Sequence, residues 1–213
     1  MADDTEEDNP RDVERFNRLA QQMAVMVDVR AAIGHFLADF AVFESIYLTA
    51  ALKAVSYDAT VIEHLPELMD LRNRLKLLKY LGTARQLSKQ LMDDVISVRS
   101  AASQLSEFRN EIAHNAAMLS MPFLTDPDSS DIVAGVQRPR SKWIVSSASI
   151  QPDEVMALHR KWMIPVDRIR ECTEAAVQLQ RATNQLATKL DCYKRNEPWE
   201  HMTVAKVSVP KQA

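Results

Sequence analysis

The sequence predicts an all-α fold, a bundle of long helices in up-and-down order with a small β-hairpin insertion near residues 121–150. Apolar residues recur at helical spacing through most of the 213-residue chain. Only three residues are glycine, which argues against Gly-rich phosphate loops and nucleotide-binding βαβ units. The hydrophobic content of 46% is sufficient for one well-packed core.

We expect three parts along the chain. Residues 1–8 form a disordered acidic tail, residues 9–192 a single helical domain, and residues 193–213 a flexible C-terminal tail. Five acids and no bases lie within residues 1–10, which leaves 26 bases against 24 acids in the remainder. This slightly basic body permits a nucleic-acid surface without requiring one.

Two helices are predicted before residue 57. The first runs from Pro10 to about Val27, with Asn9 as its N-cap. Its apolar stripe consists of Val13, Phe16, Leu19, Ala20 and Met23. The second runs from about Val29 to Ser56, and its buried side consists of Ile33, Phe36, Leu37, Phe40, Ala41, Leu48 and Leu52.

Glu44 interrupts the buried side of this second helix. At about 100° per residue it lies within about 20° of Leu37, so its carboxylate should point toward the core. A buried carboxylate needs a partner, because burial alone would neutralise it. Either Glu44 pairs with a cation on a facing helix, or it lies in solvent at the frayed edge of the stripe.

A third helical block is expected over residues 58–81, interrupted by Pro66 and ended by Gly82. Its second part is lined by Leu68, Leu71, Leu75, Leu78 and Leu81. Four bases accompany these leucines, and we interpret them as a solvated face, with an RNA-facing strip as the alternative. They are Arg72, Arg74, Lys76 and Lys79.

A fourth block, from Arg85 to about Leu119, contains a segment unlike the rest of the chain: residues 108–115 read Phe-Arg-Asn-Glu-Ile-Ala-His-Asn. Arg109 lies on the edge of the core face, where it is the natural cation for Glu44. Asn110 and His114 are neighbours on the far side. Arg109 and His114 diverge by about 140° on a straight helix, so either the helix is distorted or the His114 face meets a second copy. The core face consists of Val98, Ala101, Leu105, Phe108, Ile112, Ala116 and Leu119.

Prolines interrupt the helical period between residues 121 and 150, and segments 132–136 and 142–145 read as a hairpin. A last helix is expected from about Pro152 to Leu190, kinked at Pro165. Its heptad seam is either bundle core or a dimer contact. The seam consists of Trp162, Ile169, Cys172, Ala176, Leu179, Leu186 and Leu190.

The two cysteines, Cys172 and Cys192, fall in this last helix, about 30 Å apart along its axis, so they cannot pair with each other. No apolar run approaches the roughly 18 residues of a membrane span, and no signal peptide is evident. We therefore expect a cytoplasmic protein without a membrane partner.

Arg109, Asn110 and His114 together resemble the motif of the HEPN superfamily. Its nucleases are helical bundles carrying an Arg, four to six residues and then a His, often with a polar residue directly after the Arg. Many members also carry an acidic residue on an early helix, and Glu44 is similar to it. The same spacing occurs at Arg30–His35 and Arg195–His201, but only the central copy has the helix, the Asn and a plausible carboxylate.

The resemblance implies a metal-independent endoribonuclease that acts as a homodimer, in many cases as a toxin or antiviral defence protein. RNA cleavage without metal needs a base for the 2′-OH proton, a cation for the charge on phosphorus and an acid for the 5′-oxygen. Two copies of Arg109 and His114 would supply these roles across a shared cleft. Asn110 would hold the imidazole in one tautomer.

The alternative is a non-catalytic helical dimerisation, adaptor or antitoxin-like protein, for which the heptad seam and the acidic tail suffice. A di-iron bundle would use Glu111 and His114, but it requires a second Glu-x-x-His, and the sequence has none. Spaced Cys/His pairs for zinc are also missing. We expect no cofactor and no metal, and as partners RNA, a second copy, and an antitoxin or other protein.

Overall fold

A computed structural model describes residues 10–56, 62, 64, 69–115, 135–137 and 163–210. Helices make up most of these residues, which confirms the all-α class. They are α1 (Pro10–Val42), the π-helical turn η1 (Phe43–Tyr47), α2 (Leu48–Val55), α4 (Leu71–Ala84), α5 (Lys89–Asn115) and α7 (Val166–Lys194). The acidic tail, residues 142–145 and residues 152–162 lie outside the described part.

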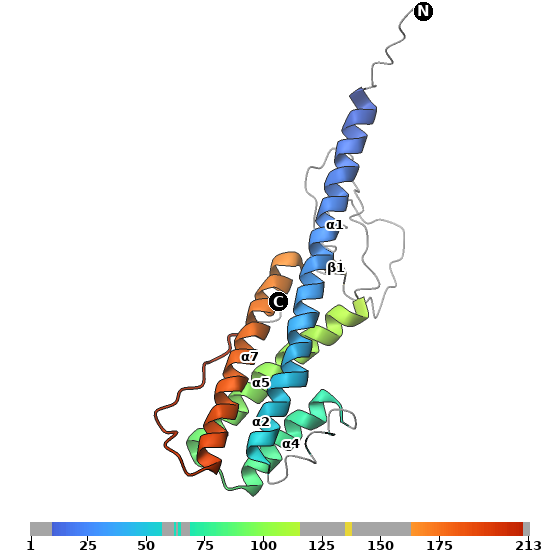
Figure 1. Ribbon diagram of the computed structural model, residues 1–213. Helices are drawn as coiled ribbons and strands as arrows, with labels where there is room; N and C mark the ends of the chain where they lie inside the picture. Colours follow the sequence, from blue (N-terminus) through green and yellow to red (C-terminus); the bar gives the residue numbers. More distant parts are fainter. Residues whose placement is uncertain are drawn as a thin grey trace, which may run out of the picture.

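The two predicted N-terminal helices are one continuous rod. α1 runs without a break past Val27 and continues through η1 into α2. The predicted boundary between Val27 and Val29 is therefore wrong, and no glycine or proline lies near residue 28 to end a helix. The N-terminal part of α1 extends well beyond the ends of the neighbouring helices (Figure 1).

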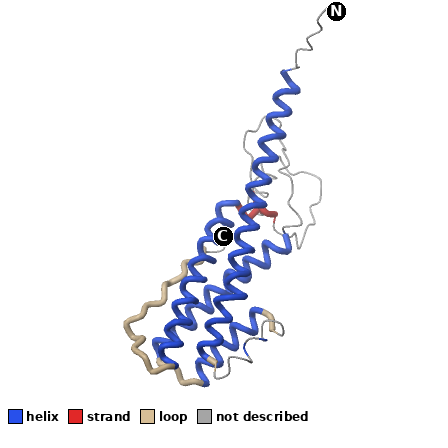
Figure 2. Tube along the Cα trace, in the orientation of Figure 1, coloured by secondary structure: helices blue, strands red, loops and turns tan. Residues whose placement is uncertain are grey.

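Long helices surround a single core (Figure 2). α7 lies along α1 and α2, and α5 packs against α7 and α4. Phe36 of α1 meets Phe108 of α5 edge to face, with ring centroids 5.1 Å apart. The predicted core faces hold for Val98, Ala101, Leu105, Phe108, Ile112, Ile33, Phe36, Phe40, Leu48 and Leu52, all of which are buried.

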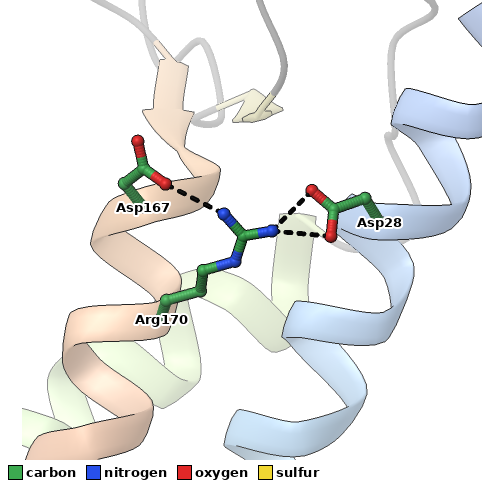
Figure 3. A network of polar contacts seen from close by, with 3 residues as sticks. All are labelled: Asp28, Asp167 and Arg170. Atoms are coloured by element: carbon green, nitrogen blue, oxygen red, sulfur yellow. Dashed lines mark hydrogen bonds and ion pairs between the residues drawn. The ribbon is translucent and has the colours of Figure 1, made fainter. Parts of the chain in front are cut away.

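A surface ion pair fixes the start of α7 against α1 (Figure 3). Arg170 donates from Nη2 to both carboxylate oxygens of Asp28, over 2.7 and 2.8 Å. Its Nη1 donates to Asp167 over 3.0 Å. All three side chains are half-exposed or more, so this network defines the relative position of two helices rather than contributing much stability.

α4 begins where Asp70 caps it, accepting a hydrogen bond from the Asn73 N–H over 2.8 Å. The prediction that Gly82 ends this helix was wrong. Gly82 is buried within α4, and a Cβ there would lie 2.9 Å from Met92 Sδ, so the glycine permits close packing. The helix instead ends through Gln86, which adopts a left-handed conformation with φ of 52°.

The insertion contributes strand β1 (Gly135–Gln137), which pairs antiparallel with β2 (Met163–Pro165), Val136 opposite Ile164. β2 lies within the segment predicted to be helical, so the last helix starts later than expected. α7 begins at Val166, and Pro165 is its N-cap residue rather than a kink. A proline fits there because the first helical N–H groups have no acceptor within the helix.

The heptad seam of α7 is bundle core, because Ile169, Cys172, Ala176, Leu179, Leu186 and Leu190 are all buried. Residues 195–210, within the predicted C-terminal tail, run back along α7 and are called the C-terminal strap below (Figure 1). Gln185 Oε1 accepts from the Ala205 N–H over 2.8 Å, and Arg168 donates to the Pro210 carbonyl over 2.9 Å. Apolar side chains of the strap pack on the core: Trp199, Val204, Val207 and Val209.

Candidate functional site

Arg109 and Asn110 lie together on the surface near the end of α5. Both side chains are exposed, and Arg109 Nη1 donates to Asn110 Oδ1 over 3.1 Å. Phe108 and Ile112 are buried, and Arg109 lies at the edge of the face that they form, with Asn110 on the far side of the helix. The amide therefore holds a solvent-facing guanidinium in a defined position.

His114 lies in the last turn of α5, about 6 Å along the axis beyond Asn110, and its side chain lies outside the described part. α5 is α-helical throughout Lys89–Asn115, so the predicted alternative of a local distortion is wrong. The hydrogen bond to Asn110 draws the Arg109 guanidinium toward the side of the helix on which positions 110 and 114 lie.

The predicted ion pair between Glu44 and Arg109 is not formed. Arg109 is exposed and bonded to Asn110, whereas Glu44 is partly buried in the turn η1. Phe36 lies level with Phe108, and Glu44 is eight residues further along the rod in the direction away from the end of α5. The two residues are therefore about 12 Å apart along the axis. The prediction placed Glu44 near the correct face but could not place it at the correct height.

A different cation, Arg74, contacts Glu44, and it binds the backbone carbonyl of this residue and not its carboxylate. Arg74 of α4 donates from Nη1 to the Glu44 carbonyl over 2.8 Å. A π-helical turn disturbs the regular i to i+4 ladder, and Arg74 supplies a donor at that point. Arg74 is only 7% exposed, so its interpretation as part of a solvated face was wrong. The sequence did contain a signal for the burial of Arg74, which is its position in the leucine repeat, directly before Leu75.

A cavity of about 250 Å³ opens beside the Arg109 segment, between α5, α7 and the C-terminal strap. Its walls combine an apolar floor with polar side chains at the rim: Gln104, Glu107, Phe108, Arg168, Cys172, Val209 and Pro210. Burial raises the pKa of the Cys172 thiol to about 11, so the thiol stays protonated near neutral pH and is a poor nucleophile. Sequence reasoning missed this cavity because the strap forms one wall.

A buried cation lies at the other end of α5. Lys189 of α7 is 1% exposed, and its Nζ is 2.7 Å from Asp94 Oδ2. The ammonium also lies 5.4 Å from the centroid of the Trp199 ring on the strap. This arrangement pins α5, α7 and the strap together, far from Arg109, and we assign it to stability.

No protein-family model matches the chain, and no match was found among curated proteins or solved structures. No helix in the described ranges is long and apolar enough to cross a membrane. Among the same residues, no three His, Cys, Asp or Glu side chains gather into a group able to hold a metal ion. The case for function therefore depends on the α5 site and on the surface around it.

Proposed function

We propose that this chain is a metal-independent endoribonuclease of the HEPN type, with its active site at the end of α5. The observation that supports the proposal most strongly is the exposure and orientation of the Arg109 guanidinium. Its guanidinium is exposed, is oriented by Asn110, and forms no ion pair with a carboxylate in the described part of the chain. A guanidinium of this kind is available to hold a phosphate by two parallel charge-assisted hydrogen bonds.

The proposed reaction is an internal transesterification. The His114 imidazole takes the proton from the ribose 2′-OH, and the 2′-oxygen attacks the adjacent phosphorus. Arg109 stabilises the charge that builds on the phosphate oxygens. The bond from phosphorus to the 5′-oxygen breaks, which leaves a 2′,3′-cyclic phosphate on one fragment and a 5′-hydroxyl on the other.

The departing 5′-oxygen needs a proton, and the chain offers one His in this motif. We assign the acid role to the imidazole of a second copy, in a composite site shared by two chains. Asn110 positions the guanidinium directly, and it lies one turn from His114 on the same side of the helix. Glu44 has no part in this site, because it lies about 12 Å away along the bundle.

Such an activity suits a toxin or an antiviral defence effector acting on cellular RNA in the cytoplasm, with an antitoxin or another protein as its regulator. The unpaired state of both Cys172 and Cys192 agrees with a reducing compartment.

A second candidate function is a non-catalytic dimerisation or adaptor role. The observation that favours it is the exposed apolar face of α1, where five large side chains remain in solvent. An adaptor would bind a protein through this face and leave RNA intact. The two functions differ in one respect that is simple to measure, which is whether Arg109 and His114 are needed for RNA cleavage.

The test is to incubate the purified protein with structured and single-stranded RNAs in EDTA and to analyse the ends of the products. The proposal predicts cleavage with 2′,3′-cyclic phosphate ends, abolished by His114→Ala. His35→Ala is the matched control, because His35 is exposed on α1 within another copy of the same spacing. Intact RNA with the wild-type protein under all conditions, together with capture of a protein partner by α1, would favour the adaptor.

A further inference from the structure

The N-terminal part of α1 extends beyond the bundle (Figure 1). It carries a row of large apolar side chains in solvent. Their exposed fractions run from 44% to 70%. The row consists of Val13, Phe16, Leu19, Met23 and Val27. Single exposed apolar residues are ordinary, but a contiguous row of this kind marks an interaction surface.

This row faces away from the bundle. At about 100° per residue, Phe16, Met23 and Val27 lie about 140° to 180° around α1 from Phe36, which is fully buried. The chain's own core therefore cannot cover them. Few charged positions lie on this side: Asp12 and Arg30 fall between Met23 and Leu19 around the helix, and the other acids and bases of α1 lie further round.

The same face continues along the bundle as small residues. Ala31, Gly34, Ala38 and Ala41 are all exposed, and a Cβ added at Gly34 would meet nothing within 4 Å. One face of α1 thus carries large side chains in its N-terminal half and small ones in its C-terminal half. Small residues allow a second helix to approach closely and to place large side chains against them.

We propose that this face binds a second copy of the chain, with the two α1 helices antiparallel and a two-fold axis at Val27. The residues of the face are spaced identically in both directions from Val27, at steps of four, three, four and three. Two-fold pairing therefore brings each of the three large residues Met23, Phe16 and Val13 onto a small one. The facing pairs are Met23 with Ala31, Ala20 with Gly34, Phe16 with Ala38, and Val13 with Ala41.

The size of the surface fits a stable dimer. The face spans residues 13–41, a length of about 42 Å. This length offers about eight turns of each α1 to the contact. An isologous contact of this kind also closes on itself and leaves no free face for further growth.

The antiparallel orientation follows from shape and charge. In a parallel pair Phe16 would face Phe16 and Gly34 would face Gly34, so the helices would be forced apart at one end and leave a gap at the other. A parallel pair would also place two acidic segments, residues 1–10 of each copy, side by side. In the antiparallel register the two Pro10 positions are about 50 Å apart.

This contact is independent of the proposed RNA site. α5 packs on the inner side of α1, so pairing through the outer face leaves Arg109 uncovered in both copies. Loss of self-association through α1 is therefore separable from loss of the RNA site.

Sedimentation equilibrium at micromolar concentration tests the contact. We expect Phe16→Glu to lower self-association at this face at least 100-fold, and Gly34→Leu to do the same by blocking the approach of Ala20. Gln21→Glu is the matched control, because it adds the same charge to an exposed position on another side of α1. Each variant should keep the wild-type helical circular dichroism. A wild-type protein that sediments only at 24.1 kDa, or association unchanged in Phe16→Glu and Gly34→Leu, would overturn the proposal.

Cysteine cross-linking tests the register, in full-length protein carrying Cys192→Ser so that only buried Cys172 remains. Under mild oxidation Val27→Cys should form a covalent dimer, because two copies of position 27 meet at the axis. Ala20→Cys should not, because its two copies lie about 21 Å apart in this register. Equal cross-linking at both positions would indicate a parallel pair and contradict the antiparallel one. Cross-linking at neither position would contradict contact through this face.

Discussion

Arg74 of α4 donates a hydrogen bond of 2.8 Å from Nη1 to the backbone carbonyl of Glu44, in the middle of the continuous rod formed by α1, η1 and α2. The Arg74 Nε atom beside it is buried and has no hydrogen-bond partner. The cation thus serves the backbone of a π-helical turn and not the carboxylate that the sequence suggested. Substitution of Arg74 should therefore destabilise the protein more than substitution of Glu44.

Arg74→Ala should lower the free energy of unfolding by about 1 to 3 kcal/mol, because a partly buried carbonyl loses a charged donor. Glu44→Ala keeps that carbonyl and should cost less than about 1 kcal/mol. Arg72→Ala, at an exposed position of the same helix, is the control for loss of charge. Urea unfolding measures all three, and a Glu44→Ala variant less stable than Arg74→Ala would show that the carboxylate is the important group.

Asp94 neutralises Lys189, which is fully buried. Asp94→Ala should therefore destabilise the protein by about 3 to 5 kcal/mol, because it leaves a buried cation unpaired. Adding Lys189→Met should restore most of this loss, since it removes the charge and keeps much of the side-chain volume. Thermal melts can compare both with Asp93→Ala, an exposed neighbour on α5. Equal melting temperatures for Asp94→Ala and Asp93→Ala would refute a stabilising role for the pair.

Cys172 makes stability depend on pH in the alkaline range. Burial raises its pKa from 9.0 to about 11, so the folded state keeps the thiol proton where the unfolded chain loses it. This contribution, about 2 to 3 kcal/mol, is fully present below pH 9 and is lost as pH rises through about 11. The stability difference between wild type and Cys172→Ala should shift in favour of the variant by this amount between about pH 8 and pH 11. A difference that is constant with pH would contradict the raised pKa.

The apolar period of the sequence predicted the helices and much of the core. Leu105, Phe108 and Ile112 are buried as expected, and the cap at Asp70 starts α4 close to the predicted second part of its block. Periodicity gives the face on which a residue lies, and it does so well on a regular helix such as α5. It cannot give the positions along their axes at which two helices contact each other. The sequence therefore predicted an ion pair between Glu44 and Arg109, which are separate in the fold.

Other errors have similar physical causes. No residue pattern predicted the π-helical turn η1. This turn alters the environment of Glu44. The strap reads as a polar tail, because its few apolar residues are useful only once α7 supplies a surface and glutamine side chains for its backbone. The sequence predicted the apolar stripe of α1 but could not tell that the other described elements would leave it exposed.

The central claim is that the α5 site cleaves RNA without a metal, and His114→Ala tests it most directly. Initial cleavage rates should be measured in EDTA for wild type, His114→Ala and the control His35→Ala, each with its melting curve. We predict that His114→Ala lowers the rate by about 10² to 10⁴ while His35→Ala has no effect, and that the wild-type products end in 2′,3′-cyclic phosphates. Cleavage by His114→Ala at the wild-type rate, with the same product ends, would contradict the account.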